Sequence, residues 1–247
     1  MPLPANPALP SYPRVVLVGD TGVLVELGDA IDPQVNARVL ALAVGLRDLA
    51  LAGVRDVVPT YASVLVHLDP DAADQEAVAK VALSLAGRTD AQVPEGRAWQ
   101  VPVAYGGEHG VDLAEMAAEK GMSEAELVRR HTAPTYRVYM IGFQPGFAYL
   151  GGLDPTLAKS RRTDPRPRTP AGSVSIGGAQ TAVASVEAPS GWHLIGRTPA
   201  LPFRLGREPV FLFQAGDTVR FEPIDGETFR TLAARAAEGE LIAERLR

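Results

Sequence analysis

The segment GFQPGFAYLGG, residues 142–152, says most about the fold. Glycine and proline recur between three aromatic residues, so the segment is a poor strand and a good shaped loop. Glycines let a backbone approach a ligand closely or take a positive φ, and aromatic rings supply rigid apolar walls. Two interpretations stay open at this point: a ligand-binding loop, or a tight turn whose aromatic rings belong to the core.

The sequence around this segment predicts a β-rich domain. From residue 136 to residue 223, glycines and prolines separate short β-prone runs, which is typical of a barrel or a sandwich. A strand is expected before it, at residues 100–105, and two short helices follow that strand, at 112–120 and 123–132. Ser123 and Glu126 have the spacing of a capping box. The chain is again helical from residue 226, with a break at Gly239.

The N-terminal part predicts a smaller α/β unit. Strands and helices are expected in the order ββαββα, which suits a small sheet with helices on one face. Their expected bounds are 15–18, 23–27, 33–50, 54–59, 63–68 and 72–86. We therefore expect an α+β protein with an extended or disordered tail (1–12), a small N-terminal α/β sandwich (13–90) and a β-barrel domain with a C-terminal helix (91–247). Residues 87–98 are the best candidate for a linker.

Composition excludes several classes of function. The chain of 247 residues has 46% apolar and 21% charged residues, as in soluble globular proteins. Its net charge of −5 argues against a nucleic-acid surface. Cysteine is absent, which excludes disulfides, thiolate nucleophiles and thiolate zinc sites. No signal peptide or membrane-spanning run is found, so the expected localisation is cytoplasmic, with no membrane partner.

An arginine-rich segment, RRTDPRPRTP at residues 161–170, is the first candidate binding element. Its prolines forbid a helix, so the charges are expected on an extended loop. Guanidinium groups bind carboxylates or phosphates through paired hydrogen bonds. A solvated basic loop, or a patch that docks an acidic partner, is the competing interpretation.

Two further segments, AGSVSIGGAQT (171–181) and PSGWHLIGRTP (189–199), are candidates for chemistry. The first lacks the glycine pattern of an esterase nucleophile, and the chain has no GxxxxGK[ST] phosphate loop. In the second, Trp192 and His193 are expected on opposite faces of a strand. His193 suits general acid–base work, although a structural histidine is the commoner case. The other histidines lack metal-ligand spacing, so no transition-metal site is expected.

Together these segments resemble one family. The matching elements are YGGE (105–108), Asp112-Leu113, His131-Thr132, GFQPGFAYLGGLDP, RRTDPRPRTPAGSVSIGG, Gln180-Thr181 and GWHLIGRTP. In this order they resemble the family of KipI, PxpB and allophanate hydrolase subunit 1, over about residues 12 to 225. The resemblance implies an N-terminal α/β domain followed by a cyclophilin-like β-barrel.

The resemblance also implies a function and partners. Members act as the PxpB component of an ATP-dependent 5-oxoprolinase, which opens 5-oxoproline to glutamate together with a PxpC-like (KipA-like) subunit and a PxpA-like protein. On that basis this chain is expected to be a hydrolase subunit that is inactive alone. ATP with Mg²⁺ is the expected cofactor, bound mainly with the partner subunit, because no carboxylate cluster for the metal is apparent here.

The resulting site hypothesis assigns a role to each candidate. His193 and Arg166 are predicted to be catalytic, and no metal ligand is assigned. Substrate-binding residues are predicted to be Gln144, Phe147, Tyr149, Arg168 and Arg197. The arginines are expected to hold negative charge that develops at the lactam carbonyl. All of these side chains are expected to converge on one acidic small molecule at the mouth of the barrel.

Two alternative functions remain open within the resemblance. One is a KipI-type inhibitor of a sensor histidine kinase, with the loop around residues 145–149 forming a groove for a proline-containing segment. The other is a subunit of a urea- or allophanate-metabolising enzyme. A barrel does not by itself distinguish them, because one fold serves many functions.

Overall fold

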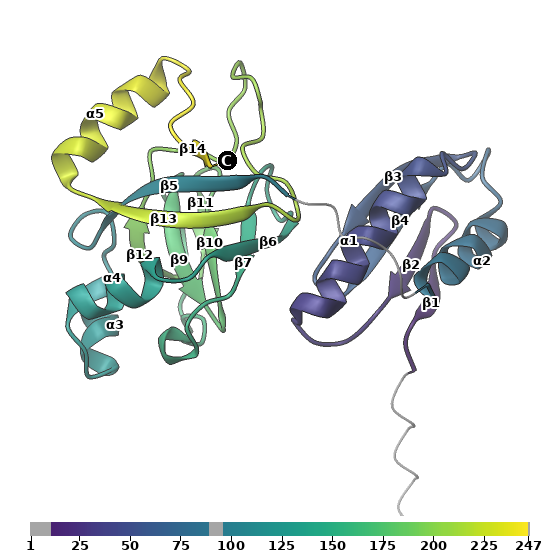
Figure 1. The fold of residues 1–247 in the computed structure, drawn as a ribbon, viewed down its shortest axis with the longest axis horizontal. Coiled ribbons are helices and arrows are strands. Elements are labelled where there is room, and N and C mark those ends of the chain that lie inside the picture. The colour runs from purple at the N-terminus through teal and green to yellow at the C-terminus, as the bar shows by residue number, and fades with distance from the viewer. Residues whose placement is uncertain (1–10, 89–95, 247) are drawn as a thin grey trace, which may run out of the picture. The chain divides into compact units, whose positions relative to one another are not determined.

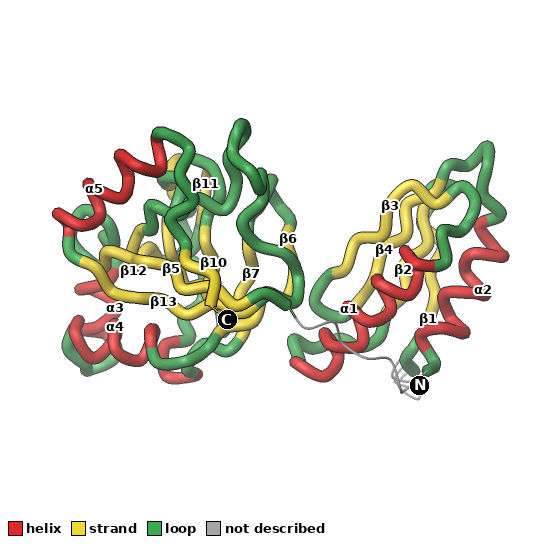
Figure 2. Tube along the Cα trace, turned by 45° about the horizontal axis from the view of Figure 1, so that its top comes forward, coloured by secondary structure: helices red, strands yellow, loops and turns green. Residues whose placement is uncertain are grey.

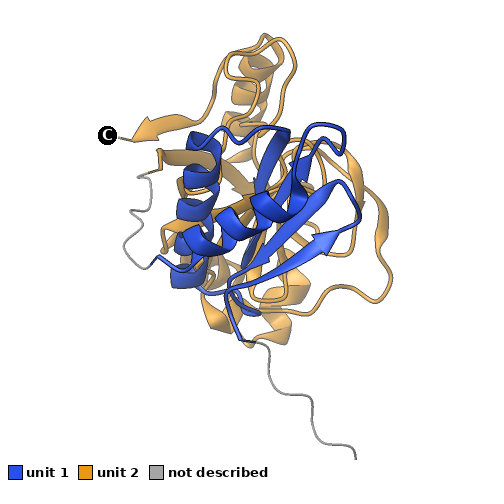
Figure 3. Ribbon diagram, turned by 90° about the vertical axis from the view of Figure 1, so that its right-hand side faces the viewer, with its two compact units in different colours: residues 1–94 blue, residues 95–247 orange. Residues whose placement is uncertain are grey.

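The computed structural model describes residues 11–88 and 96–246, and the chain divides into two compact units, residues 1–94 and 95–247 (Figure 3). Most of the predicted tail, residues 1–10, lies outside the described residues. The predicted domain boundary between residues 90 and 91 also lies outside them. Each unit has its own hydrophobic core.

The N-terminal unit is a four-stranded antiparallel sheet with two helices. In chain order its elements are β1 (Arg14–Val18), β2 (Gly22–Glu26), α1 (Pro33–Asp48), β3 (Val54–Pro59), β4 (Ser63–Leu68) and α2 (Gln75–Ala86). The sheet order is β1-β2-β4-β3, and both helices lie on the same face of it (Figure 1). Side chains alternate between the two faces of the sheet along β2, and Val23 and Val25 are fully buried on the face that the helices cover.

The predicted start of α1 is confirmed. The Asp32 side chain accepts hydrogen bonds from the backbone N–H groups of Gln34 (2.8 Å) and Val35 (3.0 Å). Pro33 occupies the first turn, where its missing N–H costs no intrahelical bond. The turn between β1 and β2 uses Gly19 at φ 56°, a conformation that glycine adopts without steric strain.

The C-terminal unit is a closed β-barrel flanked by helices (Figure 2). In chain order its elements are β5 (Ala98–Tyr105), α3 (Leu113–Glu119), α4 (Glu124–Thr132), β6 (Tyr136–Ile141), β7 (Ala148–Gly151), a 3-10 turn η1 (Pro155–Leu157), β8 (Arg166–Thr169), β9 (Ser173–Gly177), β10 (Gln180–Val183), β11 (Ala188–Ser190), β12 (His193–Arg197), β13 (Thr218–Ile224), α5 (Gly226–Ala237) and β14 (Glu244–Leu246). The main sheet has the order β12-β9-β10-β7-β6-β13-β5-β14. Strands β8 and β11 form a separate two-stranded sheet.

Strand β5 closes the barrel because it pairs on both edges. One edge runs parallel to β13 from Ala98 to Ala104. The other edge pairs with β14 at its beginning and with β12 at its end, through Ala104 and Tyr105. Seven strands of the eight-stranded sheet therefore form a closed ring, and β14 lies outside it.

A buried carboxylate joins the beginnings of β5 and β13. Asp217, 2% exposed, accepts hydrogen bonds from the backbone N–H of Arg97 (2.9 Å), the Trp99 indole (3.0 Å) and the backbone N–H of Gln214 (2.9 Å). The Arg97 guanidinium also donates to it, at 2.7 Å. These donors satisfy a charge that would otherwise be costly to bury.

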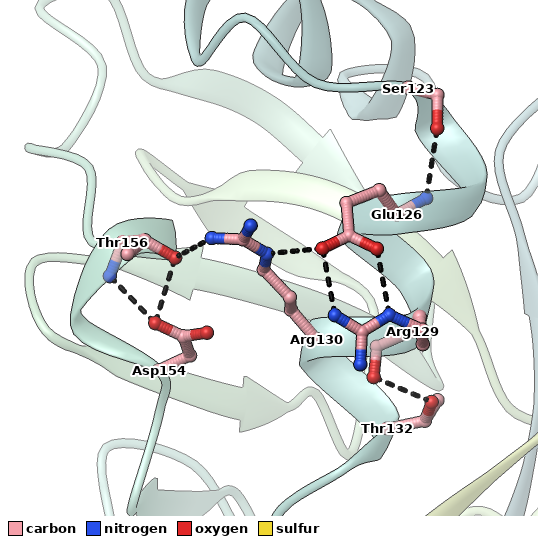
Figure 4. Close-up of polar contacts among 7 residues, drawn as sticks. All are labelled: Ser123, Glu126, Arg129, Arg130, Thr132, Asp154 and Thr156. Atoms are coloured by element: carbon pink, nitrogen blue, oxygen red, sulfur yellow. Dashed lines mark hydrogen bonds and ion pairs between the residues drawn. The ribbon is translucent and has the colours of Figure 1, made fainter.

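Helix α4 is attached to the chain after β7 by an arginine (Figure 4). Ser123 caps the helix by accepting from the backbone N–H of Glu126 at 3.1 Å. Instead of completing the capping box, the Glu126 carboxylate accepts from Arg129 and from Arg130, and these bonds lower the pKa of Glu126 to about 2. Arg130 also donates to the Thr156 hydroxyl at 3.0 Å, within η1.

A neutral histidine lies in the barrel core. His131, fully buried at the end of α4, bonds through Nδ1 to the Tyr105 hydroxyl (2.9 Å) and through Nε2 to the Thr181 hydroxyl (3.0 Å). Its ring stacks on Phe221 with 5.0 Å between centroids. Its ring also lies 5.4 Å from that of Tyr136, so the side chain contacts four strands of the barrel: β5, β6, β10 and β13.

The predicted α+β class, the ββαββα order and the barrel are confirmed. The strand β14 was not predicted, because its three residues, Glu-Arg-Leu, carry no strand signal of their own and become a strand by pairing with β5. Within residues 11–88 and 96–246, no helix combines the length and the apolar character that crossing a bilayer requires.

The buried histidine predicts a pH-dependent stability. Burial lowers the pKa of His131 to about 3, from a reference value of 6.5. Between these values the unfolded chain binds a proton that the folded chain does not. The free energy of unfolding should therefore fall as the pH decreases from about 6.5 toward about 3, by up to about 1.4 kcal/mol per pH unit for this group.

Urea unfolding of the wild type and of His131→Gln, at several pH values in this range, checks this dependence. The variant should be less stable at neutral pH, and its free energy of unfolding should lose the part of its pH dependence that His131 contributes. His67→Gln is the matched control, since His67 is exposed on β4. Equal slopes in the wild type and His131→Gln would contradict the assignment.

Candidate functional site

A cavity of about 160 Å³ lies on the outer face of the barrel wall. Leu194, Ser175, Ala182 and Tyr149 are paired in one row across β12, β9, β10 and β7. Neighbouring residues on these strands, such as Ile176, belong to the barrel core and point the other way. The cavity is lined by Phe143, Gln144, Phe147, Tyr149, Arg161, Thr169, Ser173, Ser175, Ala184, Val186, Ala188, Pro189, Ser190, Gly191, Trp192 and Leu194.

Three aromatic rings form the apolar wall of the cavity. Phe147 and Tyr149 are edge-to-face at 4.8 Å between centroids, and Trp192 lies edge-on to them at 6.4 and 6.1 Å. The indole packs directly over Gly177, where an added Cβ would come within 2.4 Å of the ring. Any side chain at this position would displace Trp192, so the glycine helps to set the shape of the cavity.

The loop 142–147 contains an exposed aromatic residue, Phe143, next to this wall. Phe143 has φ 67°, a left-handed conformation that bulky residues rarely adopt, and its side chain is 72% exposed. It contacts Phe147 edge-to-face at 5.8 Å. An exposed aromatic residue held in a strained conformation beside a cavity is typical of a ligand-contacting loop.

The polar groups of the cavity differ in how well they are satisfied. The hydroxyls of Thr169 and Ser173 donate to the carbonyls of Ala188 and Pro170, both at 2.7 Å. Ser175 is 5% exposed, and within the described residues its hydroxyl has no hydrogen-bond partner. Partial burial raises the pKa of Tyr149, against an opposing effect of Arg161, so the phenol is neutral at physiological pH.

The structure brings three of the predicted substrate-binding residues together at this cavity: Gln144, Phe147 and Tyr149. Their contact with a substrate stays a prediction. The predicted convergence of the other candidates is not seen, because His193, Arg166, Arg168 and Arg197 are not among the lining residues.

Arg166 is engaged by a buried carboxylate. Its guanidinium donates to both oxygens of Asp112, with 2.8 Å between Nη1 and Oδ2. The Asp112 side chain is 4% exposed and also accepts from the backbone N–H of Leu194 at 2.7 Å. Arg162 lies 3.6 Å from the same carboxylate. This cluster joins the start of α3 to β8 and β12.

Arg168 and Arg197 point elsewhere. The side chain of Arg168 is 84% exposed and lies 3.7 Å from the carboxylate of Glu187. Arg197 donates through Nε to the carbonyl of Ala171 at 2.9 Å, and its guanidinium lies over the Phe229 ring at 5.8 Å.

His193 lies on the opposite face of β12 from the cavity. As expected, it points away from Trp192, which lines the cavity, and its register partner Ile176 faces the core. Its Nε2 is 2.9 Å from the carbonyl oxygen of Ser160. The catalytic role of His193 stays a prediction, and the structure gives it a second role in holding the residue before Arg161.

Arg161 is the charged residue among the cavity residues that the site hypothesis missed. It supplies the guanidinium group among the lining residues and lies over the Trp192 ring at 5.7 Å. The arginine-rich segment was recognised, but spacing does not reveal which of its arginines meets Asp112 and which meets the cavity. That choice depends on a carboxylate about fifty residues earlier in the chain.

The described residues offer little for a metal or a nucleotide. Within residues 11–88 and 96–246, no three histidine or carboxylate side chains are grouped so that they could hold a metal ion. The cavity has about 160 Å³ and one guanidinium, which does not fit a nucleoside triphosphate.

The Asp112 cluster predicts a stability effect that must be separated from catalysis. Arg166→Ala would leave a buried carboxylate without its paired donor, so we expect the free energy of unfolding to fall by about 2–3 kcal/mol. Urea denaturation measures this loss. Arg168→Ala, at an exposed position of the same strand, should change it by less than about 0.5 kcal/mol. Equal stabilities of the two variants would contradict the structural role of Arg166.

Comparison with known proteins places the chain in a family. The model of the carboxyltransferase domain, subdomain C and D, matches residues 13–213. The chain is 37% identical over 227 residues to the 5-oxoprolinase B-subunit of Bacillus subtilis (strain 168), covering 87% of this chain and 95% of the relative. It is 39% identical over 211 residues to the 5-oxoprolinase B-subunit of Escherichia coli O157:H7, covering 85% and 95%.

Solved structures agree with this assignment. The crystal structure of TTHA0988 superposes with a TM-score of 0.75 at 35% identity, over 83% of this chain and 40% of the other chain, so this chain spans less than half of that protein. The urea amidolyase of K. lactis gives a TM-score of 0.77 at 19% identity, over 98% of this chain and 17% of the other, which supports the fold alone. The chain therefore belongs to the family of carboxyltransferase subdomains C and D, the family of KipI, PxpB and allophanate hydrolase subunit 1 that its motifs resemble.

Proposed function

We propose that this chain is the PxpB component of an ATP-dependent 5-oxoprolinase, which opens 5-oxoproline to glutamate in the cytoplasm together with PxpC-like and PxpA-like partners. The observation that carries the proposal is the match to two 5-oxoprolinase B-subunits over 95% of their lengths. The cavity supports it, because aromatic walls and a guanidinium suit a small acidic ring compound.

The chemistry of the reaction explains why several chains take part. Opening the lactam breaks its C–N bond, adds the oxygen of water to the carbonyl carbon and leaves a proton on the nitrogen. An unstrained amide resists this step, so the reaction is coupled to ATP. We assign to this chain the binding and orientation of the ring, which lowers the entropic part of the barrier.

The nucleotide is proposed to bind mainly with the PxpC-like partner, with its Mg²⁺ held through the phosphates. The small volume of the cavity and the lone guanidinium among its described lining residues support this division. No step of the reaction on this chain is assigned to ATP.

A KipI-type inhibitor of a histidine kinase is the second candidate function. The aromatic wall of Phe147, Tyr149 and Trp192 favours it, since such a wall also suits a proline-containing segment. The urea- or allophanate-metabolising alternative has the fold in common with urea amidolyase at 19% identity, and no described feature of the cavity favours it.

Reconstitution tests the proposed function. The chain, co-purified with its PxpC-like partner and supplied with the PxpA-like protein, should hydrolyse ATP faster when 5-oxoproline is present and should release glutamate. The chain alone should do neither. Absence of any 5-oxoproline-dependent turnover in the full mixture would overturn the proposal, and tight binding of a kinase without these partners would favour the inhibitor.

Two substitutions separate the possible roles of His193. His193→Gln keeps an N–H donor for the Ser160 carbonyl but cannot transfer protons, whereas His193→Ala loses both properties. Because His193 points away from the cavity, we expect His193→Gln to retain turnover and His193→Ala to raise KM for 5-oxoproline. A fall in kcat of about a hundredfold or more in both variants, with KM unchanged, would instead establish the acid–base role predicted from the sequence.

A further inference from the structure

We propose that the outer-wall cavity binds a small cyclic monocarboxylate, and that Arg161 anchors the carboxylate while the ring lies against Trp192. This inference rests on the proposed function and adds to it the location of the substrate site and a specificity-determining residue. It follows from the charges, the backbone contacts and the polar groups of the cavity.

The distribution of charges singles out Arg161. Its neighbours in the arginine-rich segment are engaged: Arg162 and Arg166 by Asp112, and Arg168 by Glu187. Among the described residues, no carboxylate forms an ion pair with Arg161, although it lines the cavity. The described lining includes no acidic residue and no lysine. A ligand with one negative charge would therefore balance the positive charge of Arg161.

The backbone around Arg161 is held from both sides. Lys159 and Gly178 exchange two backbone hydrogen bonds, of 3.0 and 2.7 Å. The Ser160 carbonyl is bound by His193, and the Arg162 N–H donates to the Gly191 carbonyl at 2.7 Å. The Trp192 ring then supports the guanidinium from one side at 5.7 Å. The Arg161 side chain itself is exposed, so it can reach a ligand from a backbone whose position is already held.

A second polar group points to a ligand with a neutral hydrogen-bonding group. Ser175 lines the cavity, and within the described residues no hydrogen bond engages its hydroxyl. The hydroxyl is therefore available to donate a hydrogen bond to a ligand in the cavity, or to accept one from it. Gln144, at the rim, offers an amide that can pair with a lactam N–H and C=O at once.

The size and the walls of the cavity define the body of the ligand. A cavity of about 150 Å³ is large enough to hold benzene, and this one has about 160 Å³. The rings of Phe147, Tyr149 and Trp192 suit a compact ring rather than a flexible chain. A five-membered lactam with one carboxylate meets all of these conditions.

The test compares an acid with its uncharged amide on two variants of the full-length chain. 5-Oxoproline and 5-oxoprolinamide are titrated into the wild type and into Arg161→Gln, with binding followed by calorimetry or by NMR. The wild type should bind the acid about tenfold or more tighter than the amide. Arg161→Gln should weaken binding of the acid by about ten- to a hundredfold and leave binding of the amide almost unchanged.

Arg230→Gln is the matched control, because Arg230 is an exposed arginine of α5 and its loss changes the net charge equally. It should bind both compounds like the wild type. The inference is overturned if Arg161→Gln binds the acid as well as the wild type does, or if the wild type binds neither compound at millimolar concentration. Binding of a proline-containing peptide with a blocked C-terminus, in place of the acid, would also overturn it.

These outcomes are separate from those of the proposed function. Normal 5-oxoproline-dependent turnover of a reconstituted Arg161→Gln complex would contradict the proposed role of Arg161 without contradicting the proposed function. If the wild-type chain binds the acid selectively but its reconstituted complex shows no turnover, the proposed function is contradicted and the proposed binding site is not.

Discussion

The double pairing of β5 is the constraint on which the rest of the C-terminal unit depends. This strand pairs with β13 along one edge and with β14 and β12 along the other, so the sheet has to close. Asp217 stabilises the closure by gathering donors from Arg97, Trp99 and Gln214. Closure turns alternate residues of β9, β7 and β12 outward, and Ser173, Ser175, Tyr149 and Leu194 among them line the cavity.

A second carboxylate determines where positive charge is available. Asp112 engages Arg166 and lies near Arg162, so these two guanidinium groups are directed to the carboxylate and not to the cavity. Arg161, next in the chain to Arg162, faces the cavity with the Trp192 ring beside it. The stability of the loop and the electrostatics of the candidate site therefore come from the same arginine-rich segment, with different arginines serving each.

Much of the fold and part of the site could be predicted from sequence. Periodicity and capping residues such as Ser123 located the helices, because these signals act within a few residues of the chain. The aromatic loop was singled out from the sequence, and its Phe147 and Tyr149 line the cavity, while their contact with a substrate stays a prediction. The arginines could not be assigned, since each finds its partner through a contact distant in sequence, as Arg166 does with Asp112.

The sequence by itself determined the ββαββα order of the N-terminal unit, the absence of cysteine chemistry and, through its long composite motif, the family. Local signals suffice for these properties. Only the tertiary structure decided which of Trp192 and His193 lines the cavity, and which arginine of the segment 161–170 does so. The side of a strand or loop that a residue occupies depends on pairing register and on partners elsewhere in the chain, and neither is encoded in the neighbouring residues.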